Sequence, residues 1–158
     1  MSRVTPDQPG PLSAAEEAAI RALARVMSVL PKLMDADMRR GAGISLTDYG
    51  ILMHLSEAPG RHMRMSDLAA ACDLSLSGMS RAVARLESDG LVLRVRCGED
   101  ARGWNAVLTD TGFARLEDAY PTNLVSTRRR VLDRFEGIDL AALATAFDRV
   151  AADPDSDL

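Results

Sequence analysis

The chain has 158 residues, 47 % of them hydrophobic, which is enough for one sizeable core but few for two independent domains. No apolar run approaches the roughly 20 residues that a membrane span needs, and residues 1–11 lack the apolar centre of a signal peptide. We therefore expect one compact unit that works in the cytoplasm. The two cysteines, Cys72 and Cys97, form no CxxC motif and no disulfide framework.

The distribution of charge is a better guide to nucleic-acid binding than the net charge of −4, because binding to phosphates needs basic side chains gathered on one face. Residues 1–60 carry a net charge of −1, residues 61–104 of +1 and residues 105–158 of −4. Every basic residue of the middle segment is an arginine, whose planar fork suits both phosphate and guanine. They are Arg61, Arg64, Arg81, Arg85, Arg94, Arg96 and Arg102. The chain has a single lysine, so the use of arginine rather than lysine in this segment follows from overall composition. The evidence for DNA binding must therefore come from where the arginines lie.

The first predicted helix follows a polar arm, residues 1–12, which we expect to be flexible. Residues 13–16, Ser-Ala-Ala-Glu, form a capping box, and apolar side chains then recur at spacings of three and four over residues 20–34. This pattern predicts an amphipathic helix of about 25 residues that is ended by glycines just after residue 40. Pro31 removes one backbone donor, so we expect a kink or a break there.

The next segment predicts a helix-turn-helix. Thr47 is expected to cap a helix that stops at Pro59-Gly60, and residues 63–65 form a short extended piece. A helix opened by Ser66 and a second one over residues 76–89 are then separated by the turn at residues 73–75, and this is the geometry of a helix-turn-helix. Asp73 occupies the turn position that adopts left-handed backbone, which Asp tolerates better than most residues.

A β-hairpin is predicted directly after these helices. Leu91, Leu93 and Val95 alternate with Val92, Arg94 and Arg96, which predicts a strand with the leucines and Val95 inside and both arginines along the outer face. Residues 104–109 are the partner strand, and residues 97–103 form a polar tip bracketed by glycines.

Two further helices are predicted at the C-terminal end. Thr109 can cap a long helix that bends at Pro121, and a final helix from Asp139 places Leu140, Leu143, Phe147 and Val150 on one face. The fold class is therefore mainly α with a small β-hairpin wing. We divide it into dimerisation helices at residues 13–40 and 121–153 and a winged helix-turn-helix lobe at residues 45–120.

The second helix of the predicted helix-turn-helix has the properties of a DNA recognition helix. Met79, Val83 and Leu86 fall at helical spacing and face the core, so the outer face carries four polar side chains, Ser77, Ser80, Arg81 and Arg85. Ser75 caps the helix, and the free amides of its first turn can hold a phosphate. An ordinary amphipathic helix has the same pattern, and the basic hairpin after it, with Arg94, Arg96 and Arg102, is what favours DNA binding.

Several segments resemble the MarR family of regulators. Residues 100–112, DARGWNAVLTDTG, are similar to the wing signature of this family, and residues 77–92, SGMSRAVARLESDGLV, are similar to its recognition helix. LTDYGILMHL at residues 46–55 and MSDLAAACDLS at residues 65–75 also match. One departure is Ala106, where many relatives carry a larger aliphatic residue.

The resemblance implies a role for individual residues. Arg102 would enter the minor groove, Asp100 would steady the wing, and Ser77, Ser80, Arg81 and Arg85 would contact the major groove. It also implies a homodimeric regulator, expected to be a repressor on an inverted repeat. Double-stranded DNA and a second copy of the chain are then its partners, and the apolar faces of residues 20–34 and 140–150 lie between the subunits.

Other functions are weaker alternatives. His54 and His62 are the only histidines and form no catalytic or zinc-binding spacing, so we expect no enzyme, no metal and no cofactor. A redox-sensing regulator using Cys72 or Cys97 and a winged helix that binds protein remain open alternatives. The resemblance to the MarR family also implies release by a small aromatic effector, for which Tyr49 and Met53 are candidate contacts, although both suit a plain core equally well.

Overall fold

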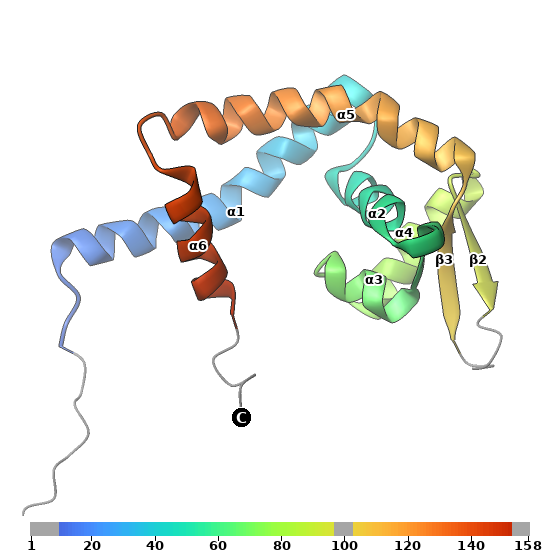
Figure 1. Ribbon diagram of the computed structural model, residues 1–158, viewed down its shortest axis with the longest axis horizontal. Coiled ribbons are helices and arrows are strands. Elements are labelled where there is room, and N and C mark those ends of the chain that lie inside the picture. The colour runs from blue at the N-terminus through green and yellow to red at the C-terminus, as the bar shows by residue number, and fades with distance from the viewer. Residues whose placement is uncertain (1–9, 97–102, 153–158) are drawn as a thin grey trace, which may run out of the picture.

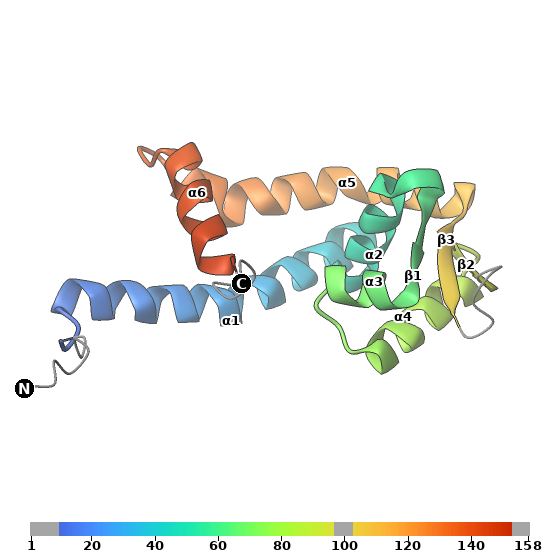
Figure 2. The same cartoon turned by 60° about the horizontal axis from the view of Figure 1, so that its bottom comes forward.

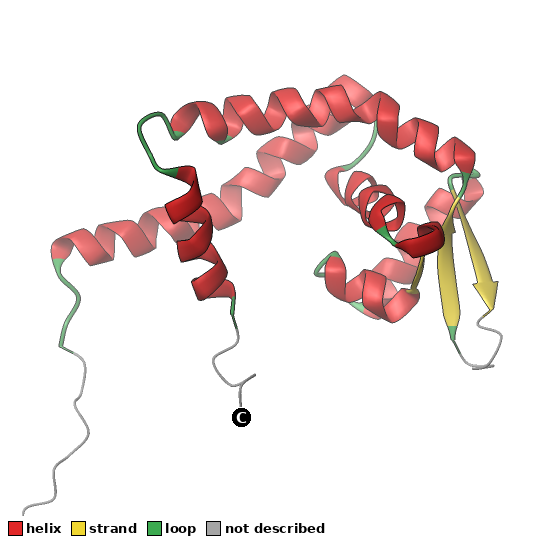
Figure 3. Ribbon diagram, viewed as in Figure 1, coloured by secondary structure: helices red, strands yellow, loops and turns green. Residues whose placement is uncertain are grey.

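A computed structural model describes residues 10–96 and 103–152. Its elements, in chain order, are α1 (Ala14–Ala42), α2 (Leu46–Glu57), the 3-10 helix η1 (Pro59–Arg61), β1 (His62–Arg64), α3 (Met65–Ala71), α4 (Leu76–Ser88), β2 (Val92–Arg96), β3 (Trp104–Leu108), α5 (Asp110–Arg130), the 3-10 helix η2 (Leu132–Arg134) and α6 (Leu140–Ala151). Helices dominate, and one small sheet lies at one end of the molecule (Figure 3). The predicted fold class is confirmed.

The long helices α1 and α5 pack against each other and join the two ends of the molecule. One end is a lobe made of α2, α3, α4 and the sheet, and α6 lies at the opposite end (Figures 1 and 2). α5 starts directly after β3 and runs from the lobe toward α6, so one continuous helix crosses the boundary that we placed at residue 120. No helix in the described ranges is long and apolar enough to cross a membrane.

Helix α1 begins and ends as its sequence predicts. The Ser13 amide donates to the Glu16 carboxylate (2.8 Å), and the Glu16 amide donates to the Ser13 hydroxyl (3.3 Å). Gly43 ends the helix in left-handed backbone with φ of 65°. Of the two outcomes expected at Pro31, the break into two helices does not occur, because α1 is one helix of 29 residues, and α5 also continues through Pro121 as one helix. A proline removes only one backbone donor, and the turns on both sides keep theirs.

Two predicted helix starts are shifted. Ser45, rather than Thr47, caps α2, since its hydroxyl accepts a hydrogen bond from the Asp48 amide (3.0 Å). α3 begins at Met65 instead of Ser66, and its N-cap, Arg64, makes no capping hydrogen bond with its side chain. Met65 is buried, so packing into the core determines this start.

The core lies mainly in the lobe, where α2, α3, α4 and the sheet meet. Its large, fully buried side chains are Met38, Ile51, Leu52, Leu55, Leu68, Met79, Val83 and Val92. Gly112, in the first turn of α5, lies so close to the strand entry that a Cβ there would be 2.1 Å from the Leu91 carbonyl oxygen. The start of α5 is therefore packed directly on the backbone that leads into β2.

The sheet is antiparallel with the order β1-β3-β2. Val92 pairs with Leu108 and is fully buried, whereas Leu93 and Val95 are half-exposed. The predicted strand therefore has the opposite phase: Leu93 and Val95 lie on the outer face, and Arg94 and Arg96 share the face of Val92. Residues 91, 92 and 93 are all apolar, so alternation alone does not determine which of them points inward.

Candidate nucleic-acid interface

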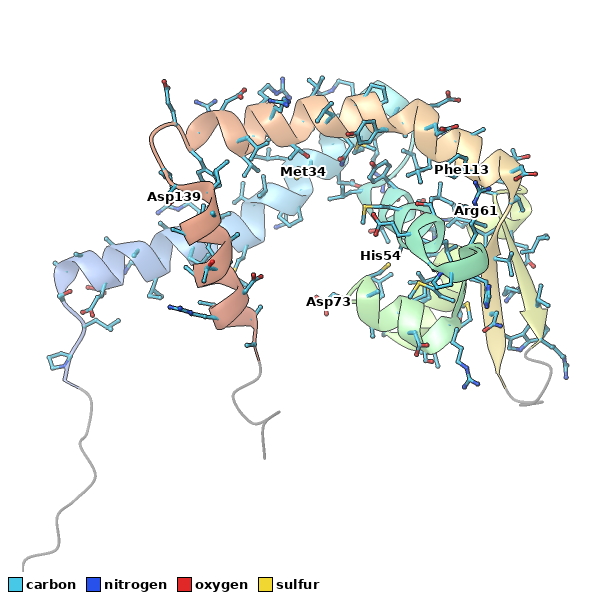
Figure 4. The ribbon with its side chains drawn as sticks, viewed as in Figure 1. Met34, His54, Arg61, Asp73, Phe113 and Asp139 are labelled. Atoms are coloured by element: carbon cyan, nitrogen blue, oxygen red, sulfur yellow. The ribbon has the colours of Figure 1, made fainter. Side chains whose placement is uncertain are left out.

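The turn between α3 and α4 has the predicted geometry. Asp73 has φ of 51°, the left-handed backbone expected at this position, and lies between the two helices (Figure 4). The Ser75 hydroxyl accepts a hydrogen bond from the Gly78 amide (3.1 Å) and thereby caps α4. The cap fixes the first turn of α4, which is the part of a recognition helix that faces DNA.

Helix α4 has a buried face and a polar face, as predicted. Met79, Val83 and Leu86 are buried. Ser77, Arg81 and Arg85 are exposed, and Ser80 is half-buried. Within the described residues, the Arg81 guanidinium has no hydrogen-bond partner, so its donors are available to a ligand.

A hollow of about 310 Å³ separates the start of α4 from the hairpin of β2 and β3, which we call the wing. Ser80 lines it from α4, Arg94 and Trp104 line it from the wing, and Arg64 and Ser66 line it from the start of α3. The structure thus adds Arg64 and Trp104 to the candidate interface. Arg64 is one of the arginines of the middle segment, but neither it nor Trp104 was predicted to face DNA, because only folding brings them beside Ser80.

The wing arginines are held in place by neighbouring side chains. The Arg94 guanidinium donates through Nε to Glu87 of α4 (2.8 Å), and its side-chain and backbone hydrogen bonds lower the pKa of the Glu87 carboxyl. Arg96 lies over the Trp104 ring at 5.1 Å from its centroid. Asp100 and Arg102, the predicted wing-tip residues, lie outside the described residues.

Arg85 is held as well, by an ion pair with another helix. Its Nη2 donates to the Asp48 carboxylate on α2 at 2.8 Å. Of the arginines predicted to face DNA from α4, Arg85 is thus paired, whereas Arg81 has no partner in the part of the chain that the structure describes.

Arg61 contacts α5 and therefore has a structural role. Its guanidinium lies 4.0 Å from the centroid of the Phe113 ring and 3.3 Å from the Asp110 carboxylate, both on α5 (Figure 4). Arg61 itself has φ of 56°, which is uncommon for a residue other than glycine. This arginine ties the turn before β1 to the start of α5.

A buried carboxylate joins α1 to α5. Asp37 accepts hydrogen bonds from the Ser126 hydroxyl (2.8 Å), from Arg129 (3.0 Å) and from Arg130 through Nε and Nη2 (both 2.9 Å). The hydrogen bond from Arg130, followed by that from Ser126, holds the pKa of Asp37 far below its usual range. Its partners lie 89 to 93 residues away in the chain, and sequence analysis did not identify this cluster.

The candidate effector contacts lie in or beside the core. Tyr49 is buried, and burial, followed by the charges of Tyr120 and Glu57, raises the pKa of its phenol. Met53 is partly buried and packs against the core.

The described residues include no group of three His, Cys, Asp or Glu side chains arranged to hold a metal ion. Burial raises the pKa of the Cys72 thiol, which disfavours the reactive thiolate. Cys97 lies outside the described residues.

A helix-turn-helix that leads directly into a small antiparallel sheet with a two-stranded wing defines a winged helix-turn-helix protein. Its recognition helix is α4. Comparison with known proteins gives the family: the chain belongs to the MarR family, whose sequence model matches residues 42–103. No match was found among curated protein sequences.

Two solved structures are similar over nearly the whole chain. Sco3205, a MarR family transcriptional regulator from Streptomyces coelicolor solved in complex with DNA, is 34 % identical, with a TM-score of 0.83 and 94 % of each chain covered. AbsC, a MarR family transcriptional regulator from the same organism, is 36 % identical, with a TM-score of 0.80, and the match covers 90 % of this chain and 96 % of AbsC.

CouR from Rhodococcus jostii RHA1, solved with p-coumaroyl-CoA bound, is 21 % identical with a TM-score of 0.69, and the match covers 89 % of this chain and 93 % of CouR. This last likeness concerns the fold alone.

Proposed function

We propose that this protein is a homodimeric transcriptional repressor that binds an inverted-repeat DNA operator in the cytoplasm and is released by a small-molecule effector. It acts as a regulator rather than as an enzyme. The observation that carries the proposal is the polar face of α4, where Ser80 lines the hollow beside the wing and the Arg81 guanidinium has no hydrogen-bond partner among the described residues. The DNA complex of Sco3205, a relative 34 % identical, supports the same partner for this chain.

In this proposal α4 lies in the major groove and the wing lies beside it. Ser77, Ser80 and Arg81 contact base edges, because they lie on the polar face in the N-terminal half of α4. The capped first turn around Ser75 faces a phosphate. Arg102, steadied by Asp100, enters the minor groove, whose negative potential attracts arginine.

We propose that a second copy of the chain packs against the end of the molecule away from the lobe, where α1 and α6 lie. Helix α6 has no buried residue, and its apolar side chains Leu140, Phe147 and Val150 are exposed. Helix α1 exposes Ile20 and Met27. Exposed apolar faces of this extent are typical of subunit interfaces, and a two-fold dimer would cover the same faces on both copies.

The dimer places two copies of α4 on the DNA, so we propose that the half-sites lie about one helical turn apart, as in other helix-turn-helix dimers. For the effector we propose a small aromatic ligand that binds between the dimerisation helices and the lobe, near Tyr49 and Met53. A thermal-shift screen of small aromatic compounds tests this part. No stabilisation by any of them would argue against an effector of this class.

The DNA contacts are tested with a duplex that the wild-type protein selects from a randomised pool. Arg81→Ala should weaken binding to this duplex by about 1–3 kcal/mol and relax the preference at one base pair per half-site, with little change on random DNA. Arg102→Ala should instead weaken binding to both and lower the salt slope by about one unit for each phosphate-linked charge removed.

The matched control for both variants is Arg21→Ala, which removes an exposed arginine of α1 whose ion pair is with Glu17 on the same helix. It should leave the affinity and the salt slope unchanged. An Arg81→Ala protein with the base preferences of the wild type would refute the proposed role of α4.

A further inference from the structure

One charged hydrogen bond connects the outer side of α4 to α2. Arg85 donates to Asp48 at 2.8 Å, and the side chains are 58 % and 17 % exposed, respectively. We propose that Asp48 and Arg85 are a positioning pair that sets the orientation of α4, so that Arg85 affects DNA recognition through the helix rather than by touching a base. This inference rests on the proposed function, in which α4 contacts the operator.

The position of Arg85 along α4 supports this role. Arg85 lies nine residues after Leu76, about 13 Å along the helix axis, in the last turn of α4. Recognition helices present mainly their N-terminal side chains to base edges. The other hydrogen bond of the Arg85 guanidinium, from Nη1 to the Arg81 carbonyl oxygen (3.5 Å), also keeps the group on the protein.

Asp48 is itself held in place, so it can serve as an anchor. It lies in the first turn of α2, where its amide donates to the Ser45 hydroxyl (3.0 Å). The same turn is bonded to α1, because the Leu46 amide donates to the Asp35 carboxylate (2.9 Å). A path of hydrogen bonds therefore runs from α1 through the start of α2 to α4.

For Arg85 to bind a base, it would have to leave Asp48 with its mostly buried carboxylate unpaired. Charge-assisted hydrogen bonds are among the stronger interactions of a side chain, and a partner left without one is unfavourable. Arg81, one turn earlier, has no such partner among the described residues and is the arginine free to contact DNA. The two arginines of α4 thus have different tasks: Arg81 contacts bases and Arg85 orients the helix.

The test is a double-mutant cycle on the duplex selected by the wild-type protein. Asp48→Asn and Arg85→Gln should each weaken binding by about tenfold, the size of an ordinary coupling between contacting residues, and the double variant should be no weaker than either single one. The ranking of single-base variants of the duplex should stay as in the wild type. Exchanging the pair, with Asp48→Arg and Arg85→Asp together, should restore affinity to within about threefold, because the ion pair is re-formed.

The control is Glu17→Gln with Arg21→Gln, which removes an exposed arginine–carboxylate ion pair within α1 that joins no two elements and should change nothing. Amide hydrogen exchange without DNA provides a second measurement. Asp48→Asn and Arg85→Gln should both accelerate exchange in the last turns of α4, to the same extent.

Three results would overturn the inference. They are a loss of preference at one base pair in Arg85→Gln but not in Asp48→Asn, independent effects of the two substitutions on affinity, and unchanged hydrogen exchange in α4. If the wild-type protein selects no sequence at all, the proposed function fails, and hydrogen exchange still decides whether the pair positions α4.

Discussion

Replacing Asp37 by Asn should destabilise the protein more than any other change of a single charge on α1. The side chain of Asp37 is 6 % exposed and is bonded to Ser126, Arg129 and Arg130 of α5. Removing one partner of a buried ion pair costs about 3–5 kcal/mol. Arg129 is 56 % exposed, so water restores part of its solvation. We therefore expect Asp37→Asn to lower the free energy of unfolding by about 2–3 kcal/mol at pH 7.

Urea unfolding at a fixed protein concentration measures this loss, because the stability of a dimer depends on concentration. The matched control is Glu17→Gln, which breaks an exposed ion pair of α1 and should cost no more than about 0.5 kcal/mol. An Asp37→Asn protein as stable as this control would refute the reasoning that α1 and α5 are joined through Asp37.

The stability that Asp37 contributes should decrease as the pH is lowered. The pKa of Asp37 is lowered in the folded state, so its stabilisation is fully present above the pKa of an unfolded Asp, about 3.9, and is lost as the pH falls below that value. The difference between wild type and Asp37→Asn should be constant from pH 7 to 5 and smaller by about 1 kcal/mol at pH 3. A difference that grows on acidification would contradict this sign.

Two further predictions concern the lobe. Gly112→Ala should lower the melting temperature strongly, because its Cβ would lie 2.1 Å from the Leu91 carbonyl oxygen, whereas Gly50→Ala, with nothing within 4 Å, should be neutral or stabilising. Equal melting temperatures for the two variants would show that the start of α5 is not packed as described. Replacing both Cys72 and Cys97 by Ser should leave DNA affinity and its response to peroxide unchanged, and gel shifts with and without peroxide check this. Loss of a peroxide response present in the wild type would favour the redox-sensing alternative.

Local features of this fold could be predicted because they depend on neighbouring residues. The caps at Ser13, Ser75 and Thr109 and the left-handed turn at Asp73 involve side chains within a few positions of each other. The apolar face of α4 follows from helical spacing alone. These features were enough to predict the helix-turn-helix and the wing.

Two of the wrong predictions, the cap of α2 and the phase of β2, have a common physical origin. Ser45 and Thr47 are both good N-caps by residue type, and the structure uses Ser45, which is buried where α2 begins. Val92 and Leu93 are both suitable inner residues for β2, and the pairing with β3 selects Val92. Neighbouring residues of equal local preference are thus distinguished only by tertiary contacts.

Sequence analysis also could not distinguish the arginines that are free for DNA from those that form contacts within the protein. Arg81 and Arg85 are alike in the sequence, both on the outer face of α4, and among the described residues Arg85 alone of the two meets a carboxylate, 37 residues away. Arg61 belongs to the most basic segment and yet packs on Phe113 of α5. Net charge and helical spacing predict where basic residues lie, whereas long-range pairing decides which of them remain free for DNA.

The most direct measurement is footprinting of the wild-type protein on its selected duplex, combined with sedimentation of the complex to determine its stoichiometry. We predict that one dimer protects an inverted repeat whose half-sites are about one helical turn, 10–10.5 base pairs, apart. Protection of a single half-site by a monomer at working concentration, or equal affinity for selected and random DNA, would contradict a dimeric regulator that recognises its operator through α4.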